Sequence, residues 1–128
     1  MSGRPVVLVV EDDDELRGLY REVLMIEGFD VHPCVDGLTA LRFLEHTRPV
    51  LIVLDLDLPD VSGVDIYAEL RAHADTHDIP VVICTGLEAV PEFPGATLLR
   101  KPCAPDQLLE VVRELLHDGD RVTGRERL

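Results

Sequence analysis

Hydrophobic and polar residues follow two different periods along this chain. Short apolar runs rich in Val, Ile and Leu end at Gly, Pro or charged residues, and this pattern predicts strands that are buried on both faces. Five such strands are expected, at Val6–Val10, Phe29–Val35, Val50–Leu54, Pro80–Cys84 and, with a weaker pattern, Ala96–Leu99.

Between the strands, apolar residues recur three and four positions apart, which predicts amphipathic helices. The first helix has Asp13 or Asp14 to cap its start and Gly28 to end it. Strands that alternate with helices favour an α/β fold, in which right-handed crossovers build a doubly wound parallel sheet with helices on both faces. Further helices are expected around Leu38–Leu44, Ile66–Leu70 and Leu108–Leu116.

The segment between Thr85 and Lys101 departs from this alternation of strands and helices. It has no apolar residues at a sustained helical period, and Pro91 and Pro94 each lack a backbone donor and clash with a preceding helical turn. A helix between the fourth and fifth strands is therefore expected to be very short or missing. The segment is either a trimmed loop without consequence or a loop that shapes a site at this edge of the sheet.

Length and composition limit what the domain can be. The 128 residues suit one domain, expected over 1–118, with a charged tail or the start of a linker over 119–128. The net charge of −13 argues against direct contact with nucleic acid or an anionic membrane, because phosphate groups attract Lys and Arg. No membrane span or signal-peptide pattern is visible, so a cytoplasmic location is expected. Reduced thiols are favoured over a zinc site or a disulfide for Cys34, Cys84 and Cys103.

Two of the predicted strands end in carboxylates. Glu11, Asp12 and Asp13 follow the first strand, and Asp55 follows the third. If these strands are parallel neighbours, the carboxylates gather at the edge where open α/β sheets bind ligands. Clustered carboxylates suit a hard cation such as Mg²⁺, and one of them could attack a phosphoryl group. The alternative is that the first three are only the acidic first turn of a helix.

The whole stretch from Val6 to Leu116 resembles the receiver domain of bacterial two-component response regulators. This resemblance implies a flavodoxin-like fold with strand order 2-1-3-4-5, which accepts a phosphoryl group from a histidine kinase. The motifs that carry it are Val9–Asp13, Leu54–Gly63, Pro80–Gly86 and Leu99–Pro102, in this order at the predicted strand ends.

The resemblance assigns a metal site. It implies that Asp55 is the phosphoacceptor and that Asp12 and Asp55 bind Mg²⁺ directly. Asp57 would contribute its backbone carbonyl, and Glu11 would act mainly through a bound water. A cation is needed here on chemical grounds, because a carboxylate among other anions is a poor nucleophile toward a phosphoryl group.

The resemblance also assigns two groups that respond to the phosphate. Thr85 would be the switch hydroxyl, and Lys101 would pair with the phosphate beside a cis Lys101–Pro102 bond. The chain departs from the family at three positions: Leu98 replaces a frequent aromatic residue, Cys103 a common Phe, and Gly86 a frequent Ala. These departures leave the phosphoryl chemistry intact and put the usual aromatic output switch in doubt.

Two other functions compete with this interpretation. Asp55-Leu56-Asp57 resembles the nucleophile motif of haloacid-dehalogenase phosphatases, with Asp57 as the acid/base, although that motif normally lies near the start of a longer chain. A binding module that keeps only the fold is the second alternative, and the complete set of acidic residues, Thr85 and Lys101 argues against it.

The expected partners follow from the receiver interpretation. They are a sensor histidine kinase or phosphotransfer protein, together with a downstream protein or an output domain outside these 128 residues. The protein is expected to be a signalling domain that catalyses only its own phosphorylation and dephosphorylation. It would be a monomer or a weak dimer that depends on phosphorylation.

Overall fold

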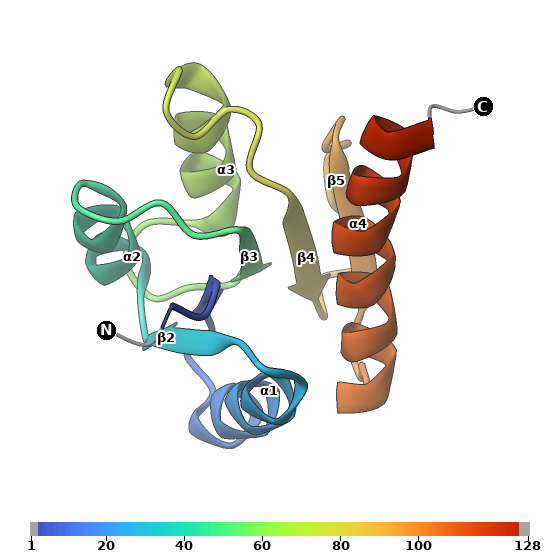
Figure 1. The fold of residues 1–128 in the computed structure, drawn as a ribbon. Helices are drawn as coiled ribbons and strands as arrows, with labels where there is room; N and C mark the ends of the chain where they lie inside the picture. The colour runs from blue at the N-terminus through green and yellow to red at the C-terminus, as the bar shows by residue number, and fades with distance from the viewer. Residues whose placement is uncertain (1–2, 126–128) are drawn as a thin grey trace.

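Five parallel strands form one sheet in the computed structural model, which describes the backbone of residues 3–125 and side chains up to Leu116 (Figure 1). Their order across the sheet is β2-β1-β3-β4-β5, which confirms the flavodoxin-like fold. The strands are β1 (Val6–Val10), β2 (Asp30–Cys34), β3 (Leu51–Asp55), β4 (Val81–Thr85) and β5 (Ala96–Arg100).

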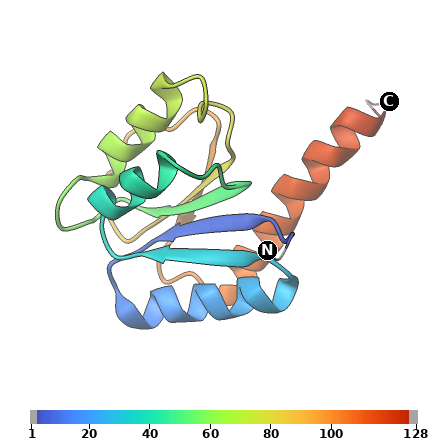
Figure 2. The same cartoon turned by 60° about the vertical axis from the view of Figure 1, so that its left-hand side comes forward.

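Four helices cover the two faces of the sheet, with α1 and α4 on one face and α2 and α3 on the other (Figures 1 and 2). Alternate residues of each strand point to opposite faces. Val7 and Val9 of β1 pack into the core cluster of α1 and α4, whereas Leu8 and Val10 pack into that of α2 and α3. The helices are α1 (Asp14–Glu27), α2 (Gly37–Leu44), α3 (Gly63–Ala72) and α4 (Pro105–Arg125).

The first helix begins and ends where its sequence signals predict. Of the two candidate caps, Asp13 is the N-cap, and its carboxylate accepts a hydrogen bond from the Leu16 amide at 2.9 Å. Gly28 ends the helix at φ 111°, a left-handed conformation that favours glycine.

No helix forms between β4 and β5, as the sequence predicts. The connecting loop, residues 86–95, is held by side chains from outside it. Arg100 donates hydrogen bonds to the carbonyl oxygens of Leu87 and Glu88. At the other end, the Tyr67 hydroxyl donates to the carbonyl of Pro94. The loop is therefore anchored at both ends without any helical turn.

The last helix is longer than the stretch expected around Leu108–Leu116. It continues to Arg125, and residues 126–128 lie outside the described part of the chain, so the charged tail or linker start over 119–128 stays a prediction. Gly119 and Gly124 do not end the helix, because an isolated glycine weakens helix propensity by only about 1 kcal/mol. The domain boundary at residue 118 stays a prediction.

Candidate functional site

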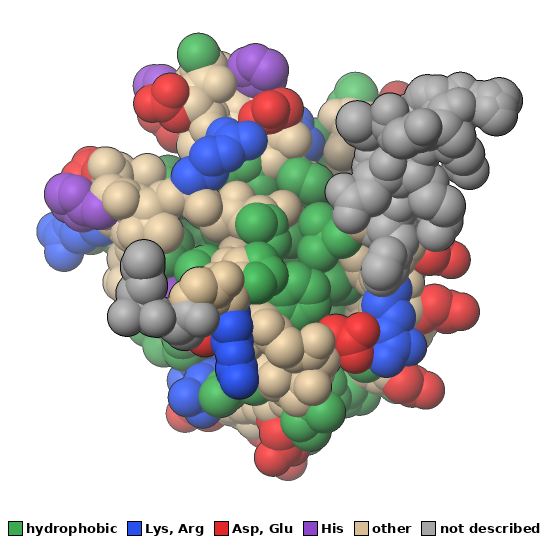
Figure 3. Space-filling view, viewed as in Figure 1, with side chains coloured by type: hydrophobic (Ala, Val, Ile, Leu, Met, Phe, Trp, Pro, Cys, Tyr) green, Lys and Arg blue, Asp and Glu red, His purple; other side chains and the backbone are tan. Residues whose placement is uncertain are grey.

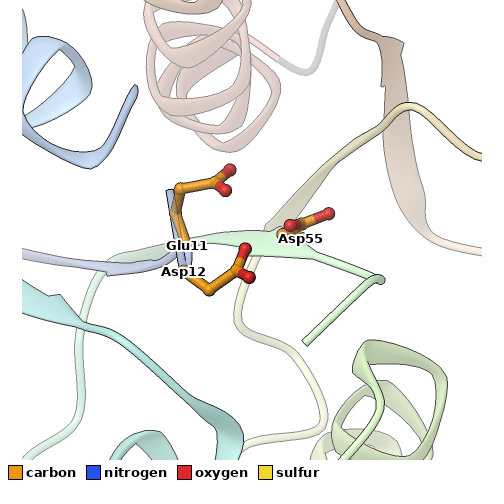
Figure 4. A group of neighbouring side chains, drawn as sticks. All are labelled: Glu11, Asp12 and Asp55. Carbon is orange, nitrogen blue, oxygen red and sulfur yellow. The ribbon is translucent and has the colours of Figure 1, made fainter. Parts of the chain in front are cut away.

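Three carboxylates meet at the C-terminal edge of the sheet. Glu11 and Asp12 follow β1, and Asp55 is the last residue of β3. The two strands are parallel neighbours in which Val10 is level with Leu54, so their ends lie side by side. One carboxylate oxygen from each of the three residues lies within 4.8 Å of those from the other two (Figure 4). The predicted gathering of Glu11, Asp12 and Asp55 is thus present.

Two of these carboxylates are buried. Glu11 is 1% exposed and Asp55 3% exposed, whereas Asp12 faces solvent. Burial raises the pKa of both the Glu11 and the Asp55 carboxyl groups above their usual values, because a charged carboxylate loses its hydration there. Since Glu11 is enclosed in the site, the simple alternative of an acidic first helical turn explains Asp13 but not Glu11.

Lys101 lies between the two buried carboxylates. Its Nζ is 2.9 Å from Oε1 of Glu11 and 3.3 Å from Oδ2 of Asp55. Burial by itself would lower the pKa of Lys101, but the two carboxylates outweigh it and raise this pKa above its ordinary value. The lysine therefore stays charged and offsets part of the repulsion between Glu11 and Asp55.

Backbone amides hold the carboxylates in place. The Asp57 amide donates to Oδ1 of Asp55 at 3.2 Å, and the Asp13 amide donates to Oε2 of Glu11 at 3.1 Å. The side chain of Asp57 is exposed and is absent from the acidic cluster in the described part of the chain. Asp57 therefore contributes to the site through its backbone.

Thr85 and Lys101 are linked through the backbone at the end of β4. The Lys101 amide donates to the carbonyl of Thr85 at 2.8 Å. The Thr85 hydroxyl is buried and accepts a hydrogen bond from the Leu87 amide at 3.1 Å. The Lys101–Pro102 peptide bond is cis, as the resemblance implied. Leu98, at the position where the family often has an aromatic residue, is 39% exposed.

Sequence reasoning missed two supporting residues. A Cβ atom on Gly63 would lie 2.3 Å from the carbonyl oxygen of Asp55, so only glycine allows α3 to start against the end of β3. Asp60 accepts hydrogen bonds from the Gly37 and Leu38 amides, both at 2.9 Å, and so ties the β3–α3 loop to the start of α2. The turn-rich sequence marks this loop but does not indicate either contact.

The donor set fits a hard divalent cation. Three carboxylate groups within 4.8 Å of one another offer only oxygen ligands, which is the chemistry that Mg²⁺ prefers. The exposed Asp12 leaves one side of the cluster open to solvent.

A family model described as the response regulator receiver domain matches residues 7–113. The chain belongs to this family. Mg²⁺ binding at an acidic pocket is typical of receiver domains. The haloacid-dehalogenase alternative is not supported, and the exposed Asp57 side chain lies outside the acidic cluster of the described residues.

Relatives of this receiver domain include longer regulators. The DNA-binding dual master transcriptional regulator RpaA from Synechocystis sp. is 35% identical over 124 residues, which are 92% of this chain and 52% of that protein. Transcriptional regulatory protein PrrA from Mycobacterium leprae is 38% identical over 118 residues, which are 88% of this chain and 50% of that protein. The chain thus spans about half the length of these relatives.

Solved structures agree with this assignment. The signal receiver domain of a signal transduction histidine kinase from Syntrophus aciditrophicus is 28% identical, with a TM-score of 0.80 over 97% of this chain and 94% of that one. A CheY-like response regulator receiver domain protein from Methanospirillum hungatei has a TM-score of 0.82 over 92% of this chain and 98% of that one. At 24% identity, the latter supports the fold alone.

The helices and the surface charges can be compared with the prediction that the chain contacts neither a membrane nor nucleic acid. Within residues 3–125, no helix is long and apolar enough to cross a membrane. On the face shown in Figure 3, the Lys and Arg side chains stand apart from one another among acidic side chains. A phosphate backbone usually needs a continuous basic surface. Because longer relatives are named as DNA-binding or transcriptional regulators, the absence of nucleic-acid contact and the cytoplasmic location stay predictions for this chain.

Proposed function

We propose that this receiver domain accepts a phosphoryl group on Asp55 from the phosphohistidine of a sensor kinase or of a phosphotransfer protein. One observation carries the proposal: the Asp55 carboxylate ends β3 beside two other carboxylates, and Lys101 lies 3.3 Å from its Oδ2. This arrangement combines a nucleophile, a metal-ligand set and a fixed cation at one strand end.

The metal would be held by the carboxylates of Asp12 and Asp55 and by the backbone carbonyl of Asp57, with Glu11 acting through water. When bound, Mg²⁺ supplies positive charge that neutralises the phosphoryl oxygens and aligns them with the nucleophile. Asp12 is the exposed member of the set, so it can exchange solvent for the cation without unfolding the site.

The transfer itself needs few protein groups. An oxygen of Asp55 attacks phosphorus, the P–N bond of the phosphohistidine breaks, and the histidine leaves as the phosphoaspartate forms. Phosphoryl transfer requires mainly positioning and charge stabilisation, and the Asp57 amide already fixes the Asp55 carboxylate through Oδ1. Lys101 then turns from Asp55 toward the new phosphate oxygens, as its flexible stem allows.

Thr85 would respond to the phosphate through its hydroxyl group. Its hydroxyl can donate to a phosphoryl oxygen, but it now accepts from the Leu87 amide at the start of the 86–95 loop. Movement of the hydroxyl toward the phosphate would change this contact, so the signal would reach the loop. Leu98 has no large ring to exchange between exposed and buried positions, so the usual aromatic switch is absent from this mechanism.

Output then runs through contacts between proteins. The proposed receiver would switch its affinity for a downstream protein or for an output domain outside these 128 residues. It remains a monomer or forms a weak dimer that depends on phosphorylation. It acts as a signalling domain and catalyses only its own phosphorylation and dephosphorylation.

Treatment with acetyl phosphate followed by intact mass measurement tests the proposal. The protein should gain one phosphoryl group in Mg²⁺ and none in EDTA, and Asp55→Asn should remain unmodified. Asp57→Asn is the matched control, because its side chain lies outside the acidic cluster and it should still be phosphorylated. Equal modification of Asp55→Asn, or equal modification in EDTA, would contradict the proposal.

A further inference from the structure

Arg17 reaches back from the start of α1 to the turn that follows β1. Its Nη1 donates a hydrogen bond to the carbonyl oxygen of Glu11 at 2.9 Å. Its Nη2 pairs with Oδ1 of Asp14, and its backbone amide donates to the Asp13 carbonyl at 2.9 Å. The arginine side chain is largely enclosed, at 17% exposure. The proposed phosphoryl transfer assigns no role to this arginine.

Helix electrostatics do not favour a cation at this position. The amino end of a helix carries a partial positive charge, so basic side chains are stabilised near the carboxyl end instead. In α1 the arrangement is reversed, because Arg17 lies near its start and its last turn contains no basic residue. The pair with Asp14 offsets little of this cost, since the Asp14 side chain is 90% exposed. The bond to the Glu11 carbonyl is therefore the contact that distinguishes this arginine.

Glu11 is held at each of its polar groups. Its amide donates to the Cys34 carbonyl at 3.0 Å, which extends the pairing of β1 with β2 by one residue. Its carboxylate meets Lys101 through Oε1 and the Asp13 amide through Oε2. The bond from Arg17 occupies the remaining group, the carbonyl oxygen. Glu11 is thus a fixed point at the end of β1.

Asp12 is exposed, but it lies between two anchored residues. The peptide unit that joins Glu11 to Asp12 is rigid, so the bond from Arg17 to its carbonyl also sets the direction in which Asp12 begins. On the other side, Asp13 is fixed as the N-cap of α1. Figure 4 shows the Asp12 carboxylate beside those of Glu11 and Asp55. The backbone of this exposed ligand is therefore oriented from both sides.

We propose that Arg17 is a positioning residue for the divalent cation site: through the Glu11 carbonyl it holds the turn that presents Asp12 to the cation. This inference rests on the proposed function, in which Asp12 binds Mg²⁺ directly. Arg17 does not bind the cation itself, because a guanidinium offers only donors and has the same sign of charge.

The charge and the hydrogen bond of Arg17 have opposite effects on Mg²⁺ affinity. As a positive charge close to the acidic cluster, the arginine repels another cation, so removal of the charge alone would tighten Mg²⁺ binding. As the group that holds the turn, it keeps Asp12 in place, so loss of the bond would weaken binding. Groups that orient a metal ligand have large effects, and we expect Arg17→Met to weaken Mg²⁺ binding by about 10-fold.

NMR titration of the full chain with MgCl₂ measures this affinity from the amide signals of residues 11–13. Arg21→Met is the matched control, because it removes the same charge one turn further along α1. Arg21 lines a pocket with Val6 and Asp30, the first residues of β1 and β2, at the opposite end of the sheet from the acidic cluster. Arg21→Met should bind Mg²⁺ like wild type, because salt screens a distant charge.

Amide exchange in EDTA tests the turn without the metal. The Asp13 amide donates to Oε2 of Glu11, and this bond depends on the conformation that Arg17 holds. In Arg17→Met the Asp13 amide should exchange several-fold faster than in wild type. In Arg21→Met its exchange should be unchanged.

The Mg²⁺ affinity also separates positioning from a general contribution to stability. If Arg17 only stabilised the fold, Arg17→Met would lower the urea midpoint in EDTA and leave the affinity of the folded protein for Mg²⁺ unchanged. If Arg17→Met does not fold, Arg17→Lys decides the matter. Lysine keeps the charge but lacks the planar fork that meets Glu11 and Asp14 together, so Mg²⁺ binding should still weaken.

Three results would overturn the positioning role: unchanged or tighter Mg²⁺ binding by the folded Arg17 variant, unchanged exchange of the Asp13 amide, or an equal loss of affinity in Arg21→Met. Failure of wild type to bind Mg²⁺ would instead overturn the proposed function. In that case the exchange measurement in EDTA would still decide whether Arg17 holds the turn.

Discussion

Lys101 lies closer to Glu11 than to the proposed phosphoacceptor: its Nζ is 2.9 Å from Oε1 of Glu11 and 3.3 Å from Oδ2 of Asp55. Glu11 therefore does more than add a third carboxylate to the acidic cluster. It holds the lysine within reach of Asp55 while leaving the Asp55 carboxylate only loosely paired. When a phosphoryl group adds negative charge to Asp55, the balance between the two contacts should shift toward Asp55.

Removal of the lysine charge should destabilise the protein. Lys101→Met leaves Glu11 and Asp55 buried beside each other without a cation. Because the lysine side chain is 19% exposed, we expect a loss of about 2 kcal/mol in the free energy of unfolding, less than for a fully enclosed pair. Urea denaturation in EDTA measures the loss, and Mg²⁺ should restore more stability to the variant than to wild type. Equal stability of the two proteins in EDTA would contradict this expectation.

Divalent cation should stabilise the fold. A ligand that binds only the native state adds RT ln(1 + [L]/Kd), which is about 2.7 kcal/mol at a concentration one hundred times Kd. Asp12→Asn should abolish most of this effect, and Glu11→Gln should weaken it less because its contact runs through water. In EDTA, Asp12→Asn should melt at a higher temperature than wild type, since one repelling carboxylate is gone. If Asp12→Asn and wild type melted at the same temperature in EDTA, the carboxylates would not repel one another as described. If Mg²⁺ did not stabilise wild type, a binding module that keeps only the fold would be favoured.

Stability without metal should fall as pH rises from the acidic side. The carboxyl groups of Glu11 and Asp55 have ordinary pKa values of 4.5 and 3.8, and burial raises both in the folded state. For each of the two groups, consider the pH range between its ordinary pKa in the unfolded chain and its raised pKa in the folded protein. In that range the folded protein binds more protons than the unfolded chain, so the free energy of unfolding decreases as the pH rises. Below the ordinary values this stabilisation is fully present. Urea denaturation of wild type and Asp55→Asn at a series of pH values in EDTA checks the sign, because the variant should lose less stability than wild type as the pH rises.

Gly63 should not tolerate a side chain. A Cβ atom there would lie 2.3 Å from the Asp55 carbonyl oxygen and 2.5 Å from Cα of Leu56, and neither backbone atom can move without shifting the site. We expect Gly63→Ala to cost about 3 kcal/mol of stability and to slow phosphorylation. Gly18→Ala is the control, since nothing lies within 4 Å of its added Cβ on α1, and it should be neutral or slightly stabilising. Equal effects of the two substitutions would mean that the packing at Gly63 is looser than described.

Phosphorylation should change the hydrogen bonds and the amide exchange of the 86–95 loop. The Leu87 amide donates to the Thr85 hydroxyl, and Arg100 holds the carbonyls of Leu87 and Glu88, so movement of Thr85 disturbs both contacts. Amide exchange with and without beryllofluoride should change most within residues 85–97. Thr85→Ala should remove the change while leaving the fold intact. Exchange differences confined to other segments would contradict a route through this loop.

The sequence alone determined much of the architecture. Strand and helix positions follow from local periodicity, because each apolar run or stripe must be buried whatever it packs against. The absence of a helix before β5 follows from Pro91 and Pro94 for a similarly local reason. The meeting of Asp12 with Asp55 needed one further assumption, that their strands are neighbours, and the strand order itself came from the family resemblance and not from the residues.

The contacts between residues far apart in the chain became visible only once the elements were packed together. The contact of Lys101 with Glu11 and the hydrogen bonds from the Gly37 and Leu38 amides to Asp60 join positions that carry no common local pattern. Such contacts depend on the register of the sheet and on the direction in which each side chain leaves it, and neither is encoded in the periodicity of a single segment. The last helix was expected only around Leu108–Leu116, whereas α4 continues to Arg125, because charged residues and isolated glycines do not by themselves end a helix.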